Sequence, residues 1–400
     1  MQQESVGVSC RRFFYGSRFL RFLRFICYDT NTNTEKKGED ALKSLGWLVV
    51  FLIAGLAISI VIGFSFSADA PARYDAEQEG LDQKVIIRFS HVVAENTPKG
   101  LAVAKFAKLV REKTDGMVEI RVYPNATLYD DETEFEALRN GSVEMIAPAT
   151  SKLSSRYPEW MIMDLPYAFE NESEVSEAMD GKLGQLLFKA INDENIKGLA
   201  LWDNGFKQVT AIKPMIDVKD FSGHSFRVMP SPVLEAQFAS LGARAQSYSF
   251  NDLYRQLQGG SVEGQENTLS NIYTKRLYQV QRYMTVSNHG YLGYIVLIDK
   301  RTWDRLSRFQ QRAVESAMEE TTAWIRQYAK QMNDRALAEM KESHAIIIHM
   351  QTTEEKQAWK EKMQPVYDRF SGVIGTPVIA EWKNLTAEHR THSPYLHSHD

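Results

Sequence analysis

The sequence predicts an α/β protein with largely parallel sheets, most of which lies outside the cytoplasm. Short apolar runs rich in β-branched residues alternate along the chain with stretches of helical periodicity, which is the pattern of strand-helix-strand units. An uncharged apolar run near the N-terminus indicates export. The 400 residues are 44% hydrophobic and 24% charged, a composition typical of globular chains rather than disordered ones.

The apolar run at 47–66 separates a basic N-terminal region from the rest of the chain. The run, WLVVFLIAGLAISIVIGFSF, has about the 20 residues that a spanning helix requires. Arginine and lysine are concentrated in 1–46, so this N-region is predicted to stay cytoplasmic and the body to be exported. The A-x-A pattern at 68–70 favours a signal peptide over 47–70, the alternative being an uncleaved membrane anchor in contact with the bilayer through 47–66. The polar segment 71–83 is interpreted as a linker.

Charge and cysteine content exclude several classes of function. The net charge is −4, and no basic cluster follows the apolar run, so no nucleic-acid partner is predicted. The two cysteines, Cys10 and Cys27, both precede that run, which leaves the body without a disulfide or a cysteine metal site. No cofactor is predicted.

Two groups of side chains could be mistaken for metal ligands. The acidic residues Asp130, Asp131 and Glu132 are interpreted as compensating the dipole at the start of a helix. The histidines at the C-terminus are interpreted as part of a solvated polar tail, 384–400. No metal site is therefore predicted.

The predicted elements alternate in order. The strands are expected at 84–91, 118–122, 143–147, 198–202, 225–229 and 294–298. The helices are expected at 101–110, 127–138, 232–241, 251–258 and 302–337. The last helix is long and charged on one side, so we expect it to cross more than one structural unit.

Polar residues inside packing segments indicate a binding site. The exported part contains no nucleophile elbow, zinc-protease motif, Walker loop or dinucleotide fingerprint, which lowers the expectation of an enzyme. Arg227 lies within a strand-like run, where a guanidinium must either form a structural salt bridge or face a polar cavity. Lys207 has the same two explanations, with plain solvent exposure as a third.

Five short segments in order resemble one family of receptors. The segments DNGFK, FRVMPS, GQEN, LRNGSVE and NHGY resemble the solute receptors of TRAP transporters, in particular the dicarboxylate-receptor (DctP-type) family, and lie at 203–207, 226–231, 264–267, 138–144 and 288–291. The resemblance extends from about Lys84 to about Val373.

The resemblance implies a fold of two α/β lobes, periplasmic-binding-protein-like (Venus flytrap), with hinge strands and a long lobe-spanning helix. The implied division is 84–206 mainly lobe I, 207–290 mainly lobe II, and 291–383 hinge strand, spanning helix and C-terminal helices.

The family also implies roles for residues at matching positions. Arg227 corresponds to the anchoring arginine that holds a substrate carboxylate with its planar fork. Asn267 would donate a hydrogen bond to the same group. Lys207 lies where relatives that bind larger acids often carry a second arginine, so a cation is kept there but not a second fork.

Five further residues are nominated for the cleft. His91, Lys99 and Ser151 belong to the first strand, the following loop and the end of the third strand, and are expected to face the ligand from lobe I. Tyr254 and Tyr291 could line the cleft, although buried aromatic residues with a satisfied hydroxyl are the more common case.

The leading hypothesis is a periplasmic receptor that binds a C4-dicarboxylate such as malate, succinate or fumarate and delivers it to a TRAP permease. Ligand contacts from both lobes exist only in the closed state, so binding favours closure. The alternative is a membrane-anchored sensor read by a signalling kinase. An enzyme acting on a carboxylate would need a general base near Arg227, and none is evident.

Overall fold

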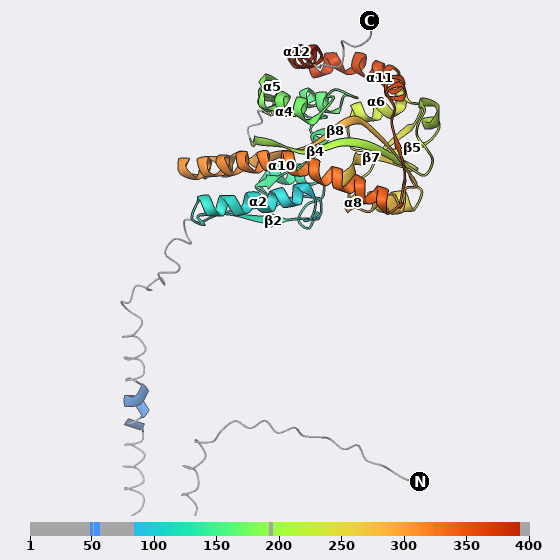
Figure 1. Cartoon of the computed structure of the whole chain (residues 1–400). Helices are drawn as coiled ribbons and strands as arrows, with labels where there is room; N and C mark the ends of the chain where they lie inside the picture. Colours follow the sequence, from blue (N-terminus) through green and yellow to red (C-terminus); the bar gives the residue numbers. More distant parts are fainter. Residues whose placement is uncertain (1–48, 51, 57–83, 192–194, 393–400) are drawn as a thin grey trace, which may run out of the picture. The chain divides into compact units, whose positions relative to one another are not determined.

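The computed structural model describes residues 49–50, 52–56, 84–191 and 195–392 (Figure 1). The chain divides into two units, Met1–Glu77 and Gln78–Asp400. Of the first unit only a short helical piece is described, in which Leu52, Ile53 and Leu56 are exposed. None of the helices in the described segments has both the length and the apolar character needed to cross a membrane. The rest of the N-region, the signal or anchor segment and the linker lie outside the described residues.

The body is built on one mixed sheet of nine strands. The order is β2-β1-β3-β8-β4-β7-β5-β6, with β9 also paired to β8. The strands are β1 Val85–Ser90, β2 Val118–Tyr123, β3 Met145–Ile146, β4 Ile196–Ala211, β5 Ser225–Val228, β6 Arg244–Ser247, β7 Gly264–Thr268, β8 Tyr283–Asp299 and β9 Ile347–Met350.

The expectation of largely parallel sheets is wrong at the centre. The outer neighbours β1/β2 and β5/β6 are parallel, but β4 runs antiparallel to both β7 and β8, and β3 antiparallel to β8. The central strands β4 and β8 are 16 and 17 residues long, and Figure 1 shows them crossing the middle of the body. The sequence prediction found only their most apolar parts, 198–202 and 294–298, because buried polar residues interrupt the rest.

Helices cover the sheet on both sides. They are α2 Pro98–Lys113, α3 Glu134–Asn140, α4 Glu172–Asp180, α5 Lys182–Ala190, α6 Pro232–Ser240, α7 Leu253–Gln258, α8 Leu269–Thr274, α9 Lys300–Arg305, α10 Arg308–Glu342, α11 Thr353–Ile374 and α12 Thr376–His392. Four short 3₁₀ helices are η2 Thr150–Lys152, η3 Pro158–Asp164, η4 Val218–Phe221 and η5 Leu277–Gln279. Helix α11 packs on α6 and η3, and α12 packs on α4 and α5.

The fold is two-lobed, and we use lobe I for residues 85–190, which carry β1–β3, and lobe II for 218–280, which carry β5–β7. The boundaries predicted from the resemblance are not tested by the structure and stay predictions. The long helix α10 packs against α2 of lobe I, against β4 and against α8 of lobe II, so it spans both lobes (Figure 1).

The predicted helix 302–337 is interrupted. Leu306 adopts an extended conformation that ends α9, and Ser307 begins α10 with a capping box in which its side chain and that of Gln310 satisfy each other's backbone N–H groups. The predicted helix 127–138 begins later, at Glu134, because the Asp130 side chain accepts hydrogen bonds from the Glu132 and Thr133 backbones and holds a turn there. At the other end, α12 extends to His392, into the segment expected to be a polar tail.

Candidate functional site

A narrow cavity lies between the two lobes. It encloses about 30 Å³, the space of about two water molecules, so the lobes must separate for an organic acid to enter. Two residues of strand β8 complete the wall. The lining residues are Val92, Val93, Lys99, Asp131, Glu134, Ala149 and Lys152 from lobe I, Arg227, Met229, Phe250, Asn267 and Asn271 from lobe II, and Leu292 and Tyr294 from β8.

Arg227 is a buried cation of the cavity without a carboxylate partner. It lies in β5, where the flanking strands β6 and β7 fix its backbone opposite Gln246 and Gln265. Only 1% of its surface is exposed, and its Nε donates to the Tyr248 carbonyl at 2.9 Å. No ion pair to Arg227 occurs among the described residues. Burial lowers the pKa of the guanidinium from its ordinary value, which an anion in the cavity would counteract.

Lys99 is a second buried cation of the same cavity. It lies in the first turn of α2, which Thr97 caps. Its Nζ donates to the Ala147 carbonyl at 2.9 Å and lies 3.9 Å from the centroid of the Tyr294 ring, a cation–π contact. Within the described segments Lys99 forms no ion pair either, and burial lowers its pKa to about 8.

Two amides of lobe II lie beside these cations. The Asn267 carbonyl oxygen accepts hydrogen bonds from the Thr268 N–H at 3.1 Å and from the Asn271 amide at 2.8 Å. This arrangement orients the Asn267 amide nitrogen, for which the described residues offer no acceptor. It is therefore a donor available to a ligand in the cavity.

An ion pair joins the lobes at the edge of the cavity. Lys152 Nζ lies 2.6 Å from Asp131 Oδ2, and the same oxygen accepts from the Phe250 N–H of lobe II at 3.1 Å. Asp131, Lys152 and Glu134 line both the inner cavity and an outer groove beside it, so they form the wall between the two. The contact of Asp131 with Phe250 crosses between the lobes, as expected of a closed state.

Lys207 lies outside this cavity lining, in a fully buried network. Its Nζ is 2.8 Å from Glu266 Oε1, and the other oxygen of Glu266 is 2.9 Å from His289 Nε2. All three side chains are at most 1% exposed. Lys207 is thus bound to a protein carboxylate, and its predicted contact with a ligand stays a prediction.

His91 and Ser151 also lie apart from the cavity lining. His91 is fully buried with no hydrogen bond to its ring nitrogens among the described residues, and burial followed by the charge of Lys99 lowers its pKa to about 3. Ser151 donates to Asp164 Oδ1 at 2.5 Å.

The two nominated tyrosines are likewise not part of the lining. The hydroxyl of Tyr291 donates to Asp203, the satisfied-hydroxyl case, and that of Tyr254 lies 3.5 Å from Gln279 near the surface. Of the eight nominated residues, the structure therefore brings Arg227, Lys99 and Asn267 together in one cavity. Their roles in binding are not tested by the structure.

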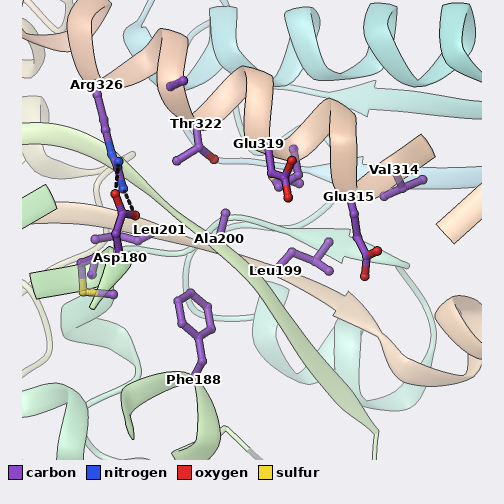
Figure 2. A pocket seen from close by; sticks show the side chains of 13 residues that line it. Asp180, Phe188, Leu199, Ala200, Leu201, Val314, Glu315, Glu319, Thr322 and Arg326 are labelled. Atoms are coloured by element: carbon purple, nitrogen blue, oxygen red, sulfur yellow. Dashed lines mark hydrogen bonds and ion pairs between the residues drawn. The ribbon is translucent and has the colours of Figure 1, made fainter. Parts of the chain in front are cut away.

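A wider groove on the body has the wrong charge for a carboxylate. It lies between α10, β4 and the helices α4 and α5 (Figure 2). Its guanidinium, Arg326, is held by two 2.6 Å contacts to Asp180, and Glu315 and Glu319 add negative charge from α10. A carboxylate would find no free cation there.

Sequence reasoning missed several residues of the site. Asp131 was assigned to helix-dipole compensation, while Glu134, Lys152, Asn271 and Tyr294 were not singled out. Their common signal was a charged or amide side chain within an otherwise apolar segment, the signal that identified Arg227. No cluster of three or more metal-binding side chains occurs in the described part of the chain.

A two-lobed fold with a cationic cavity between its lobes defines a solute-binding receptor. The chain matches the model of the family described as bacterial extracellular solute-binding protein, family 7 (DctP), over residues 89–372, and it belongs to that family. It is 45% identical over 346 residues to the C4-dicarboxylate-binding protein DctB of Bacillus subtilis, covering 86% of this chain and 99% of that protein.

Solved structures agree with this assignment. A TRAP periplasmic solute-binding protein of Shewanella oneidensis with bound succinate matches with a TM-score of 0.73 and 34% identity, covering 76% of this chain and 99% of the other. The sugar acid binding protein DctPAm of Advenella mimigardefordensis, in complex with galactonate, matches with a TM-score of 0.74 and 32% identity over 76% and 99% of the two chains. The predicted family and fold class are confirmed.

Proposed function

We propose that the protein is a periplasmic receptor that binds a C4-dicarboxylate such as succinate, malate or fumarate and delivers it to a TRAP permease without chemical change. The observation that carries the proposal is the pair of buried cations, Arg227 and Lys99, which line one cavity from opposite lobes and lack ion-pair partners among the described residues. Two separated cations match the two carboxylates of such an acid. The names of DctB and of the succinate-bound relative support this substrate class.

Each end of the acid has a distinct set of contacts in this proposal. The planar fork of Arg227 and the free amide nitrogen of Asn267 hold one carboxylate from lobe II. The remaining N–H donors of Lys99 hold the other from lobe I. Because one ligand then connects both lobes, its binding energy is fully realised only when they close, and the permease can recognise that closed shape. No feature of the chain or its relatives supports the sensor alternative.

Removing one carboxylate from the ligand should weaken binding strongly. Butyrate has the chain length of succinate but leaves Lys99 or Arg227 buried without its anion. A hydrogen-bonded contact to a charged group contributes about 1.5–3 kcal/mol, so we expect butyrate to bind about ten- to a hundredfold more weakly than succinate. Calorimetric titrations of both acids, with galactonate as a larger acid, measure this. Equal affinities for butyrate and succinate, or tighter binding of galactonate, would contradict the C4-dicarboxylate assignment.

Export should leave a mature protein that begins near Pro71. The motivation is the A-x-A pattern at 68–70 directly after the apolar run. Intact-mass measurement of the protein isolated from its native host decides between the two forms. A mass that includes the first seventy residues would show that the run is kept as an anchor.

A further inference from the structure

The cavity contains a carboxyl group whose function the binding of an anion does not explain. Glu134 begins α3, and its side chain is 1% exposed. Neither of its carboxyl oxygens has a hydrogen-bond partner among the described residues, and the side chain lines the cavity together with Lys99 and Arg227. A buried carboxylate without a donor is costly, so this group needs either a partner or a proton.

The charges around Glu134 favour a proton. The groups that face it are Lys99 from α2, Lys152 from η2, and Asp130 and Asp131 from the preceding turn. Lys152 is already neutralised by Asp131 at 2.6 Å.

The remaining cations of the cavity, Lys99 and Arg227, are balanced by the two negative charges of a dicarboxylate. An ionised Glu134 would then add one uncompensated negative charge next to the ligand's own.

The acidity of Glu134 in the ligand-free protein is already shifted in this direction. Burial raises its pKa to about 7, although Lys99 and Lys152 act to lower it. A dianion brought into the same cavity raises the pKa further, because two carboxylates that share one site cannot both stay ionised at low cost. The free carboxyl is therefore close to half-ionised near neutral pH, and loading shifts it towards the acid.

We propose that Glu134 contacts the ligand as a neutral acid, donating its hydroxyl hydrogen to an oxygen of the bound dicarboxylate, so that loading takes up one proton from solution. This inference rests on the proposed function, and it adds a specificity-determining residue that ties binding to pH. The proton passes from water to a carboxyl oxygen of Glu134, and no covalent bond of the ligand changes. Above the pKa of the free carboxyl, affinity falls by up to about tenfold per pH unit, since the proton must be supplied on binding.

Infrared difference spectroscopy of the purified full-length protein tests the inference. Spectra of the succinate-loaded minus the free protein are recorded one pH unit above the free pKa of Glu134, with ordinary succinate and with succinate labelled with carbon-13 at both carboxyl groups. We expect a new band of a protonated carboxyl group that is unmoved by the label. The band should be absent in Glu134→Gln, which keeps the shape and an N–H donor and should bind succinate within about tenfold of the parent.

Glu132→Gln is the matched control, because Glu132 is an exposed acid two residues earlier in the same turn. Its spectrum should keep the band. No band at saturation in the parent protein, a band that moves with the label, or a band that persists in Glu134→Gln would each overturn the inference. Absence of succinate binding in calorimetry is a different failure, which rejects the proposed function itself and the inference with it.

Discussion

Substitution of Arg227 by Ala should reduce the affinity for the best dicarboxylate by roughly a hundred- to several-thousandfold. Removing one member of a buried charge pair costs on the order of 3–5 kcal/mol, and about 1.4 kcal/mol corresponds to each tenfold change in affinity. Arg227 fits this case because it is 1% exposed and makes one hydrogen bond, to the Tyr248 carbonyl, which leaves the rest of its fork for the ligand. Calorimetric titration of the variant with succinate and malate measures the loss.

The stability of the ligand-free variant separates this role from a structural one. Since no protein carboxylate pairs with Arg227 among the described residues, its loss should leave the ligand-free melting temperature nearly unchanged. Arg227→Lys keeps the charge but loses the planar fork, so its affinity should lie between those of the parent and the Ala variant. Arg244→Ala, an exposed arginine on the neighbouring strand β6, is the matched control. Near-parental binding by Arg227→Ala, or a large fall in its ligand-free stability, would assign Arg227 to the scaffold.

The strands and helices that pack by simple periodicity could be predicted from the sequence. Strands β1 and β5 and helix α6 lie within one or two residues of their predicted limits, because each has an apolar pattern bounded by Pro or polar residues. The full lengths of β4 and β8 could not be predicted. Much of β4 is buried yet polar, with residues such as Asn204 and Gln208 bonded to partners distant in sequence, so its hydropathy resembles that of a loop.

The site shows the same limit. Arg227 was identifiable because a guanidinium in an apolar strand needs a special explanation. Glu134 and Lys152 were not, because acidic and basic residues near a helix start are ordinary on a protein surface, and only the tertiary fold buries Glu134. Lys207 shows the converse, since local sequence could not reveal that Glu266, 59 residues later, neutralises it.

The buried pair of Lys207 and Glu266 leads to the second large expected effect, on stability. Both side chains are fully buried and joined at 2.8 Å across β4 and β7, so neither charge can be solvated if the other is removed. Glu266→Gln keeps the shape but leaves the ammonium without its anion. We expect the free energy of unfolding at neutral pH to fall by about 3–5 kcal/mol. Urea titration followed by tryptophan fluorescence measures this change.

The pH dependence identifies the charge as the cause. Lys207 and His289 hold the pKa of Glu266 at about 2 in the folded protein, below its ordinary value of 4.5, although burial opposes this shift. The stabilisation is therefore complete above pH 4.5 and is lost as the pH falls from 4.5 towards 2, so the parent and variant should converge in acid. Glu263→Gln, which removes a partly exposed partner of His224, should cost about 1 kcal/mol or less. A Glu266→Gln variant as stable as Glu263→Gln at neutral pH would show that the amide satisfies Lys207 and that the pair contributes little to the fold.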